Sequence, residues 1–347
     1  MEIIIDDYRD SKSFSKFTFS GYKKCEVNNT LIKSLINNNV EESVFWSSEM
    51  ICSGYYIELW EIIILFTNKY INIGNPKISV YIDKNITTFK SIVTTYTNEL
   101  NLRNNINIRK LFSEIICVLC KSNRKHPFSE NKIDNSHYDI SNIGDKLKAP
   151  NMHFIDNIFK QDDIKECYVG FNELYYNIIE HKNTIMSCYW IDWIINFDIL
   201  LRKNKHITTC SVRNYINDDK YNQHIIWIVW DIFFVACKNN SFNTKIIQSL
   251  LSLFTLKFST SIPKKRKYIL YNCVSLLTEN IDQNIPILTN IETINIVHEN
   301  LNKIYKQLKQ NEKKTFDNTT ITTTNKKKIN KNTTDTMKKL QIINDIT

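Results

Sequence analysis

The strongest hydrophobic pattern in the chain lies between residues 41 and 82, which read EESVFWSSEMICSGYYIELWEIIILFTNKYINIGNPKISVYI. Apolar residues recur at helical spacing over 44–52, behind two glutamates that suit the positive end of a helix dipole. Gly54 follows at the position where a left-handed helix cap is expected. Over residues 56–70, apolar side chains surround a second helix almost completely, as in helices that are buried. The pattern predicts a buried helical hairpin around which the rest of the fold is organised.

The uncharged run at 62–68 is far shorter than the roughly 20 apolar residues that a helix needs to cross a bilayer. We therefore expect residues 56–70 to form the core helix of a soluble protein with no membrane partner. Gly74, Asn75 and Pro76 end this helix, because proline cannot continue a helix and restricts the residue before it. A brief extended segment is expected at 77–82.

Helical spacing of apolar residues continues along most of the chain. Further helices are predicted at 29–37, 89–100, 108–120, 171–180, 184–202, 224–238, 244–258, 264–279 and 291–312. Glycine and proline are scarce, with 5 of each in 347 residues, which disfavours the many tight turns of barrels and sandwiches. The predicted fold class is all-α, a multi-helix array of packed helical hairpins with a disordered basic C-terminal tail.

The length allows one large domain or two ordinary ones. Pro127, Gly144 and Pro150 lie in a polar stretch that is typical of a long loop between two halves. The predicted organisation is an irregular N-terminal segment at 1–28, an N-terminal helical half at 29–122, a polar linker loop at 123–163, a C-terminal helical half at 164–312 and a disordered basic tail at 313–347.

The tryptophans follow helical spacing. Two pairs are separated by three positions each, and the pairs lie 37 residues apart, which suits stacked helical hairpins. Aromatic stripes at this spacing are usually core, and the alternative is a surface that binds a partner. The candidates for core or partner surface are Trp46, Trp60, Trp190, Trp193, Trp227 and Trp230.

The positive charge is unevenly distributed. The formal net charge is +9, and residues 303–347 hold 11 lysines and 4 acidic residues, which leaves only +2 on the other 302 residues. Threonine, asparagine and lysine dominate the last stretch, which predicts disorder. We therefore expect any nucleic-acid binding to be weak, non-specific and carried largely by the tail, through release of counterions from phosphates.

The densest basic cluster outside the tail is PKKRKY, which holds Lys264, Lys265, Arg266 and Lys267. Such a cluster contacts phosphates or serves as a nuclear-import signal. The alternative is a solvated helix start, although positive charge at that end opposes the helix dipole. These four residues are the candidate nucleic-acid contact of the folded part.

The nine cysteines give no disulfide framework, because their number is odd and the first residues lack the layout of a signal peptide. A reducing intracellular compartment is expected. Cys117 and Cys120 form the one Cys-x-x-Cys pair, with His126, His137 and His153 downstream. Structural zinc sites usually place such a pair on a turn, whereas this pair falls inside a helical pattern, so no metal is predicted.

Catalytic machinery is not recognisable in the sequence. Glu58 and Glu61 share a helix face, and Glu49 precedes them, but without a Glu-x-x-His companion a salt-bridged face is the preferred interpretation. The chain has no Gly-x-x-x-x-Gly-Lys-Ser/Thr, no Gly-x-Gly-x-x-Gly and no Gly-x-Ser-x-Gly. We predict no catalytic residues, no cofactor and no enzymatic activity.

Several long blocks in the same order carry a resemblance to a known family: FWSSEMICSGYYIELWEIIILF with KYINIGNPK, NELNLRNNINIRKLFSEIICVL, LKAPN, CYWIDWIINFD, IIWIVWDI and KKRKYILYNCVSLLTENI. They resemble functionally unassigned proteins of nucleocytoplasmic large DNA viruses, particularly mimivirus relatives, over residues 22–312. The resemblance implies a protein made in an infected cell, located in the host cytoplasm (the viral factory) or in the nucleus. It supplies no catalytic residues.

Residues 44–82 are also similar to the collar helices of clamp-loader-like AAA+ proteins, which implies a helical oligomerisation or scaffold module. The chain has no ATPase module to accompany it. Together these patterns predict a non-enzymatic viral accessory or scaffold protein that acts through protein–protein contacts with viral partners. The alternative is a nucleic-acid-binding factor in viral replication or transcription. A broad basic face would favour the alternative, and lysines scattered among acidic residues would favour a protein partner.

Overall fold

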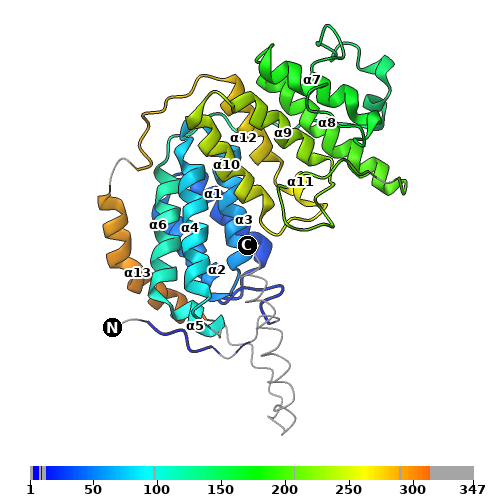
Figure 1. The fold of residues 1–347 in the computed structure, drawn as a ribbon. Coiled ribbons are helices and arrows are strands. Elements are labelled where there is room, and N and C mark those ends of the chain that lie inside the picture. Colours follow the sequence, from blue (N-terminus) through cyan, green and yellow to red (C-terminus); the bar gives the residue numbers. More distant parts are fainter. Residues whose placement is uncertain are drawn as a thin grey trace. The chain divides into compact units, whose positions relative to one another are not determined.

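The computed structural model describes residues 3–7, 9, 13–96, 99–206, 208–288 and 291–312. These residues form thirteen α-helices (Figure 1). Within the described ranges, β-structure is limited to isolated antiparallel bridges, Phe17 to Lys23 and Thr209 to His224. The predicted all-α class is confirmed. The predicted disordered tail at 313–347 lies outside the described residues.

Backbone contacts divide the chain into two units. Unit 1 comprises Met1–Phe66, Lys84–Ser122 and Pro286–Thr347, and unit 2 comprises Thr67–Asp83 and Asn123–Ile285. This division differs from the predicted halves, because the stretch 123–163 belongs to unit 2 and is not a free linker. It also divides the predicted central stretch 41–82 between the two units.

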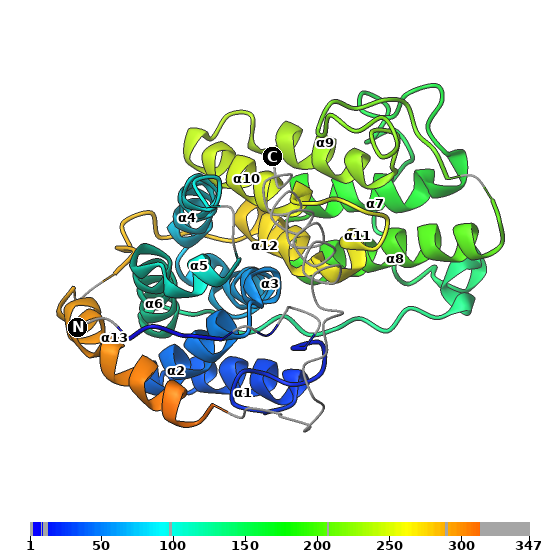
Figure 2. The ribbon, with the colours of Figure 1, turned by 90° about the horizontal axis from the view of Figure 1, so that it is seen from below.

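Unit 1 is a helical bundle with a central pair of helices and a third helix that packs on both of them. Its helices are α1 (Lys24–Ile36), α2 (Val40–Cys52), α3 (Tyr56–Phe66), α5 (Glu99–Asn104), α6 (Ile106–Lys121), α13 (Glu292–Gln310) and the second part of α4 (Lys77–Val93). Helices α2 and α6 form the central pair, and α13 covers them (Figures 1 and 2). The C-terminal helix thus completes the N-terminal bundle, which explains why the predicted halves do not match the units.

An aromatic cluster fills the core of unit 1. The ring of Trp60 lies 5.0 Å from that of Phe112 and 5.6 Å from that of Phe89, measured between centroids. Tyr56 packs on the same two phenylalanines. All four side chains are buried. The helix that is apolar on nearly all sides therefore lies where its pattern predicts, inside a protein core.

The turn between α2 and α3 has the geometry that its glycine predicts. Gly54 has a φ of 72°, in the left-handed region. The Tyr55 N–H donates to the Met50 carbonyl at 2.9 Å, and the Gly54 N–H donates to the Ile51 carbonyl at 3.0 Å. These two bonds form a Schellman motif, which satisfies carbonyls that the end of α2 would otherwise leave unpaired.

Unit 2 is built around a helix that is buried along almost its whole length. Its helices are α7 (Tyr168–Ile179), α8 (Thr184–Lys203), α9 (Ile226–Cys237), α10 (Ser241–Thr255), α11 (Ile262–Lys265), α12 (Lys267–Thr278), the first part of α4, a π-helical turn η1 (Thr67–Ile71) and the 3₁₀ turns η2 (Asn72–Gly74), η3 (Asn135–Tyr138), η4 (Ile140–Asn142) and η5 (Lys165–Cys167). Residues 268–277 of α12 are all buried, and α12 touches α7, α8, α9 and α10 (Figure 2).

Helices α7 and α8 approach closely because of one glycine. A Cβ atom on Gly170 would lie 2.8 Å from the Trp193 ring, which is closer than packed carbon atoms allow. Trp190 and Trp193 meet edge to face near this contact, with ring centroids 5.7 Å apart. On α9, Trp227 packs instead on Phe258 at 4.7 Å. The two tryptophan pairs thus serve separate aromatic clusters of the same unit.

The segment predicted as extended at 77–82 is the beginning of α4. The prediction was wrong because it took Pro76 only as the end of the preceding helical stretch. Pro76 also stands directly before the first residue of the next helix. Proline is tolerated at a helix start, where its missing N–H would have no intrahelical partner. Gly74 has a further role, since an added Cβ would lie 2.5 Å from the Arg124 carbonyl carbon. The chain at 124–125 therefore passes directly against Gly74.

Side chains of α7 hold the predicted linker in place. The buried carboxylate of Glu173 accepts hydrogen bonds from the backbone N–H groups of Lys148 at 2.9 Å and Ala149 at 2.9 Å. Next to it, the Asn172 side chain accepts from the Phe154 N–H at 3.0 Å. The segment can therefore be ordered without forming a helix, because buried side chains of α7 accept hydrogen bonds from its backbone N–H groups.

Helix α8 is the one described helix whose length and composition would suit a membrane span, with a mean hydropathy of 1.2, and 56% of that stretch is buried inside the structure. Its aspartates, Asp192 and Asp198, are both buried and hydrogen-bonded to side chains of the same unit. Buried and internally bonded carboxylates are typical of a core helix.

Candidate docking site

The N-terminal segment of unit 1, predicted to be irregular, contains a tight turn. Phe17 and Lys23 form an antiparallel bridge, and the Thr18 N–H donates to the Tyr22 carbonyl at 2.8 Å. Gly21 occupies the left-handed region with a φ of 80°, which a glycine adopts without steric cost. The turn therefore brings residues 16 and 17 back alongside the start of α1. We call residues 16–24 the N-terminal turn.

A buried carboxylate anchors this turn. Glu49 on α2 is fully buried, and it accepts hydrogen bonds from the Ser20 N–H and from the Ser20 hydroxyl, both at 2.7 Å. Burial raises the pKa of Glu49 above its usual value, and the hydrogen bonds partly offset this rise. The Ser53 hydroxyl accepts from the Phe19 N–H at 2.9 Å, and the Phe19 ring is buried. The tip of the turn is thus fixed on the bundle.

Tyr55 fixes the other side of the turn. Its hydroxyl donates to the Phe14 carbonyl and, at 3.2 Å, to the Phe17 carbonyl, while burial raises its pKa to about 12. The Lys24 ammonium lies 4.2 Å above the Tyr55 ring and pairs with Glu58. Glu58 is thus part of a salt bridge, which agrees with the interpretation preferred for it from the sequence. These contacts hold the backbone of the turn rigid while its basic side chains face solvent.

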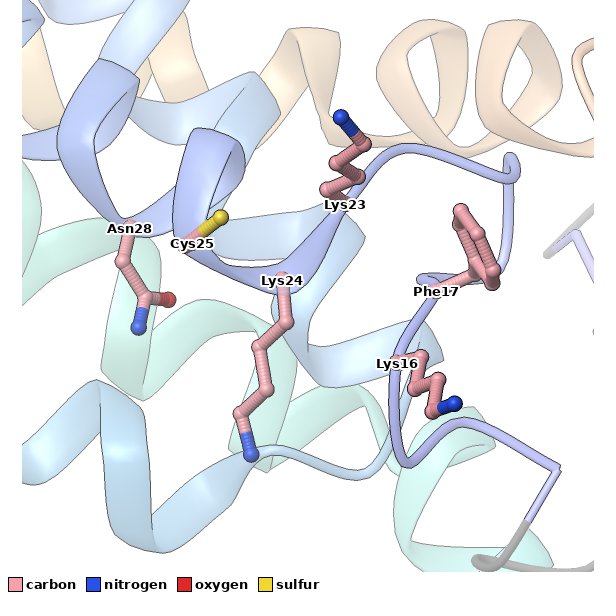
Figure 3. Close-up of a pocket in the computed structure, with 6 residues that line it drawn as sticks. All are labelled: Lys16, Phe17, Lys23, Lys24, Cys25 and Asn28. Atoms are coloured by element: carbon pink, nitrogen blue, oxygen red, sulfur yellow. The ribbon is translucent and has the colours of Figure 1, made fainter.

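Between the turn and α1 lies a shallow, open recess of about 510 Å³ (Figure 3). We call it the lysine recess. Figure 3 shows that its lining comes from the segment at 16–17 and from the beginning of α1. The residues that define it are Lys16, Phe17, Lys23, Lys24, Cys25 and Asn28.

The recess combines positive charge with exposed apolar surface. Lys16 is exposed, and among the described residues it has no carboxylate partner. Lys23 makes only an exposed contact with Glu26, at 3.5 Å, which contributes little in water. Phe17 is 49% exposed, which is unusual for a large aromatic side chain in a folded region. The site therefore offers an uncompensated cation beside an apolar ring.

An aromatic pair borders the same turn. The rings of Tyr22 and Trp46 meet edge to face with centroids 5.2 Å apart, and Tyr22 is 38% exposed. The Trp46 indole N–H donates to Glu42 at 3.3 Å. Trp46 is half-buried, whereas the other predicted tryptophans are buried in the cores of the two units, namely Trp60, Trp190, Trp193, Trp227 and Trp230. The structure therefore brings one of the six candidate tryptophans to a surface site.

The predicted nucleic-acid contact is largely internal. Arg266 is only 6% exposed, and its guanidinium donates to the carbonyls of Phe254 at 2.9 Å and Leu256 at 2.6 Å, at the end of α10. Contrary to the prediction, Arg266 is therefore not available to a phosphate, because it caps a helix. Lys267 lies 3.3 Å from the buried Asp192 carboxylate. Only the first two members of the cluster, Lys264 and Lys265, are exposed.

The cysteine pair considered for zinc lies inside α6. Cys117 and Cys120 are both buried, and burial raises the pKa of Cys117 to about 12. The Cys120 thiol donates to the Ser43 hydroxyl at 3.5 Å. Within the described ranges, there is no group of three or more His, Cys, Asp or Glu side chains that could hold a metal ion. Among all nine cysteines, Cys25 alone is exposed, and it lies in the lysine recess.

Charged clusters in unit 2 were not predicted from the sequence. Arg213 is buried and donates to both oxygens of Asp163, at 2.8 and 2.7 Å, and also pairs with Asp231. Burial raises the pKa of Asp163, but the hydrogen bonds from Arg213 and the backbone lower it below its usual value overall. The partners lie about 50 residues apart in the sequence, so no local spacing marks them. They stabilise the loop before α9 and are not exposed to a ligand.

No protein-family model matches the chain, and no curated protein or solved structure matches it either. The resemblance to viral proteins therefore stays a prediction from the sequence. The lysine recess is defined by its own residues and their contacts.

Proposed function

We propose that this chain is a non-enzymatic accessory or scaffold protein of an infected cell, which acts by binding another protein at the lysine recess. The observation that supports this most is that the recess is preformed. Buried anchors at Glu49 and Tyr55 fix the backbone around it, and they leave Lys16 and Phe17 exposed. A preformed surface binds with less loss of conformational entropy than a flexible one.

The composition of the surface favours a protein partner. Exposed aromatic side chains are enriched at protein interfaces, where they provide most of the apolar contact. Here Phe17 and the Tyr22–Trp46 pair border one turn. Lysines around the recess are interspersed with Glu26 and Glu58, which interrupts a continuous basic face. That mixed pattern supports a protein partner over nucleic acid.

The test compares two double variants, each of which replaces one exposed lysine by glutamate and one exposed apolar side chain by serine, at different places on the surface. Lys16→Glu with Phe17→Ser alters the recess, whereas Lys33→Glu with Ile36→Ser makes the same change at the exposed end of α1. A partner is first identified by crosslinking from infected cells and is then purified for titration. We expect the recess variant to bind at least about tenfold more weakly and the control to bind within about twofold of wild type. Equal affinities of the two variants would contradict the proposal.

Nucleic-acid binding is the second candidate, and one observation favours it: the net charge of +7 on residues 303–347. A chain cut after Glu312 should lose most of its binding to a random duplex while keeping its fold. Binding of the full chain should fall steeply with salt, because it depends on counterion release. Tight binding by the shortened chain at physiological salt would point instead to an organised basic site in the folded part, with Lys264 and Lys265 as the exposed candidates.

A further inference from the structure

We infer that the lysine recess recognises a short acidic peptide segment in which an aspartate or glutamate stands next to an aromatic residue. This inference rests on the proposed function, because it specifies the partner for the same site. It follows from the charge, from the apolar surface and from an unsatisfied acceptor in the recess.

The charge around the recess suits a carboxylate better than a polyanion. Lys16 has no carboxylate partner among the described residues, and Lys23 has only the exposed contact with Glu26. Lys24 is already paired with Glu58. A single carboxylate can approach Lys16 without meeting a negative group of the described residues, whereas Lys23 already lies 3.5 Å from Glu26. A phosphate backbone continues past them and would meet both glutamates, which makes a long polyanion the weaker ligand.

The apolar surface requires a large side chain next to that carboxylate. Phe17 presents about half of its surface to solvent, and the methylene stems of the lysines continue the apolar wall. An aromatic ring gains both apolar area and a favourable ring contact on such a surface, in addition to contacts with lysine ammonium groups.

Asn28 adds a polar requirement. Its side-chain oxygen is buried and has no hydrogen-bond donor within the part of the chain that the structure describes. A buried acceptor without a donor is costly, and a peptide supplies backbone N–H groups that can satisfy it.

The chain's own tail is a poor occupant. Residues 313–347 carry 8 lysines and 3 aspartates, so the tail is repelled by the lysines of the recess. The ligand should therefore come from another molecule. An acidic segment with an aromatic residue complements the site in charge and in apolar surface.

The experiment uses Cys25 as a reporter, because it is the exposed cysteine and lines the recess. The rate of its alkylation by iodoacetamide is followed by mass spectrometry of the intact full-length protein. The probes are a short Gly/Ser-flanked peptide with a central Asp-Phe pair, the same peptide with Lys-Phe or Asp-Ala, and a single-stranded oligonucleotide. The Asp-Phe peptide should slow alkylation saturably by about fivefold or more, and the other probes by less than about twofold.

Variants separate recognition from folding. In Lys16→Glu, protection by the Asp-Phe peptide should disappear when the rate with peptide is compared with that variant's own rate without peptide, because the new charge can itself alter the reactivity of Cys25. Lys33→Glu changes the charge equally at an exposed site away from the recess residues and should keep full protection. Loss of protection in both variants would show a general charge effect and would overturn the inference.

Three results on the wild-type protein would also overturn it: equal protection by the Lys-Phe peptide, stronger protection by the oligonucleotide, or no protection by the Asp-Phe peptide up to about 1 mM. If a purified partner still loses affinity in the Lys16→Glu, Phe17→Ser variant under any of these results, the proposed docking function stands and only the inferred peptide chemistry fails. If the partner binds that variant normally, the docking function itself fails.

Discussion

The densest basic run of unit 2 and the lysines of the lysine recess in unit 1 differ in how accessible their charges are. In unit 2, Arg213 and Arg266 are buried, and each is held by acidic or carbonyl oxygens of its own unit. In unit 1, Lys16 and Lys23 lie at the surface around the lysine recess. The densest basic run in the sequence thus provides structural contacts, whereas dispersed lysines on either side of a turn provide the candidate site. Local charge density does not tell whether a cation is available to a partner.

Two buried acids, Asp163 in unit 2 and Glu49 in unit 1, have different kinds of partner. Asp163 in unit 2 has Arg213 as a direct ion-pair partner, and its pKa lies below the usual value. Glu49 in unit 1 has hydroxyl and backbone donors but no ion pair among the described residues, and burial raises its pKa. The ion pair with Arg213 thus favours the charged form of Asp163, whereas hydrogen bonds only partly offset the burial of Glu49.

The largest effect is expected from Arg213→Ala. Removing the guanidinium leaves the buried Asp163 without its partner, and breaking such a pair typically costs about 3–5 kcal/mol. The free energy of unfolding from urea titration measures this loss. Lys220→Ala, at an exposed position of the same loop, should stay within about 0.5 kcal/mol. A loss of less than about 1 kcal/mol for Arg213→Ala would show that the pair adds nothing to unit 2.

The second prediction concerns pH. Burial lowers the pKa of His224 to about 4, with Asp198 opposing and Arg202 reinforcing that shift. The unfolded chain takes up this proton near pH 6.5, so stability falls as the pH decreases from about 6.5 to about 4, by about 3 kcal/mol at most. Above pH 6.5 the histidine is neutral in both states and contributes no pH dependence.

His224→Asn provides the comparison. The His224 ring accepts a hydrogen bond from the Ile226 N–H at 3.1 Å, and an asparagine at this position can accept from the same N–H. Stability of both proteins is measured by urea titration between pH 4 and pH 7. Wild type should lose about 3 kcal/mol more than the variant over this range. Parallel pH profiles would mean that the pKa of His224 is the same in the folded and the unfolded protein.

The helices were predictable because their signals are local. Apolar periodicity located most of them, and Gly54 marked the end of α2 correctly. Helix α4 was missed at its start, because Pro76 signals a helix end and a helix beginning equally well. The assignment of helices to the two units was not predictable from the sequence. Helix α13 packs on α2 and α6, which lie far before it in the chain, and local apolar patterns carry no information about such long-range contacts.

The candidate site was harder to predict than the fold. Residues 1–28 lack helical spacing, and the N-terminal turn depends on Glu49, which lies 29 positions beyond Ser20. Gly21, with two lysines after the intervening Tyr22, was the only local signal of a turn with a basic flank. Phe19 is buried against the bundle, whereas Phe17, two residues earlier, is exposed. The pattern of apolar and polar residues does not distinguish these two phenylalanines.

The third prediction contrasts two adjacent members of one basic cluster. Arg266→Ala removes a guanidinium that donates to carbonyls at the end of α10, and charged hydrogen bonds of this kind contribute about 1.5–3 kcal/mol. Lys264→Ala changes an exposed side chain and should alter stability by less than about 0.5 kcal/mol. Thermal and urea unfolding measure both. Equal effects at the two positions would contradict the different burial of the cluster members.

The fourth prediction concerns the anchor of the N-terminal turn. Glu49→Ala leaves the Ser20 N–H and hydroxyl without an acceptor and should cost about 1–3 kcal/mol. Glu49→Gln keeps an acceptor oxygen and removes the buried charge, so its stability should stay within about 1 kcal/mol of wild type at neutral pH. Urea titration at pH 7 distinguishes the two. A glutamine variant as unstable as the alanine variant would show that the charge itself stabilises the turn.

The smallest effect is expected from modification of the recess. Of the nine cysteines, only Cys25 is exposed, so the native protein should consume one equivalent of a thiol reagent, located at Cys25 by mass spectrometry. The buried thiols are protected both by lack of access and by raised pKa values, as for Cys117. Alkylated protein should unfold within about 0.5 kcal/mol of the unmodified protein, since the group lies on the surface. Reaction of two or more thiols without denaturant would mean that a core helix opens readily, and the recess would then not be the rigid surface that its anchors require.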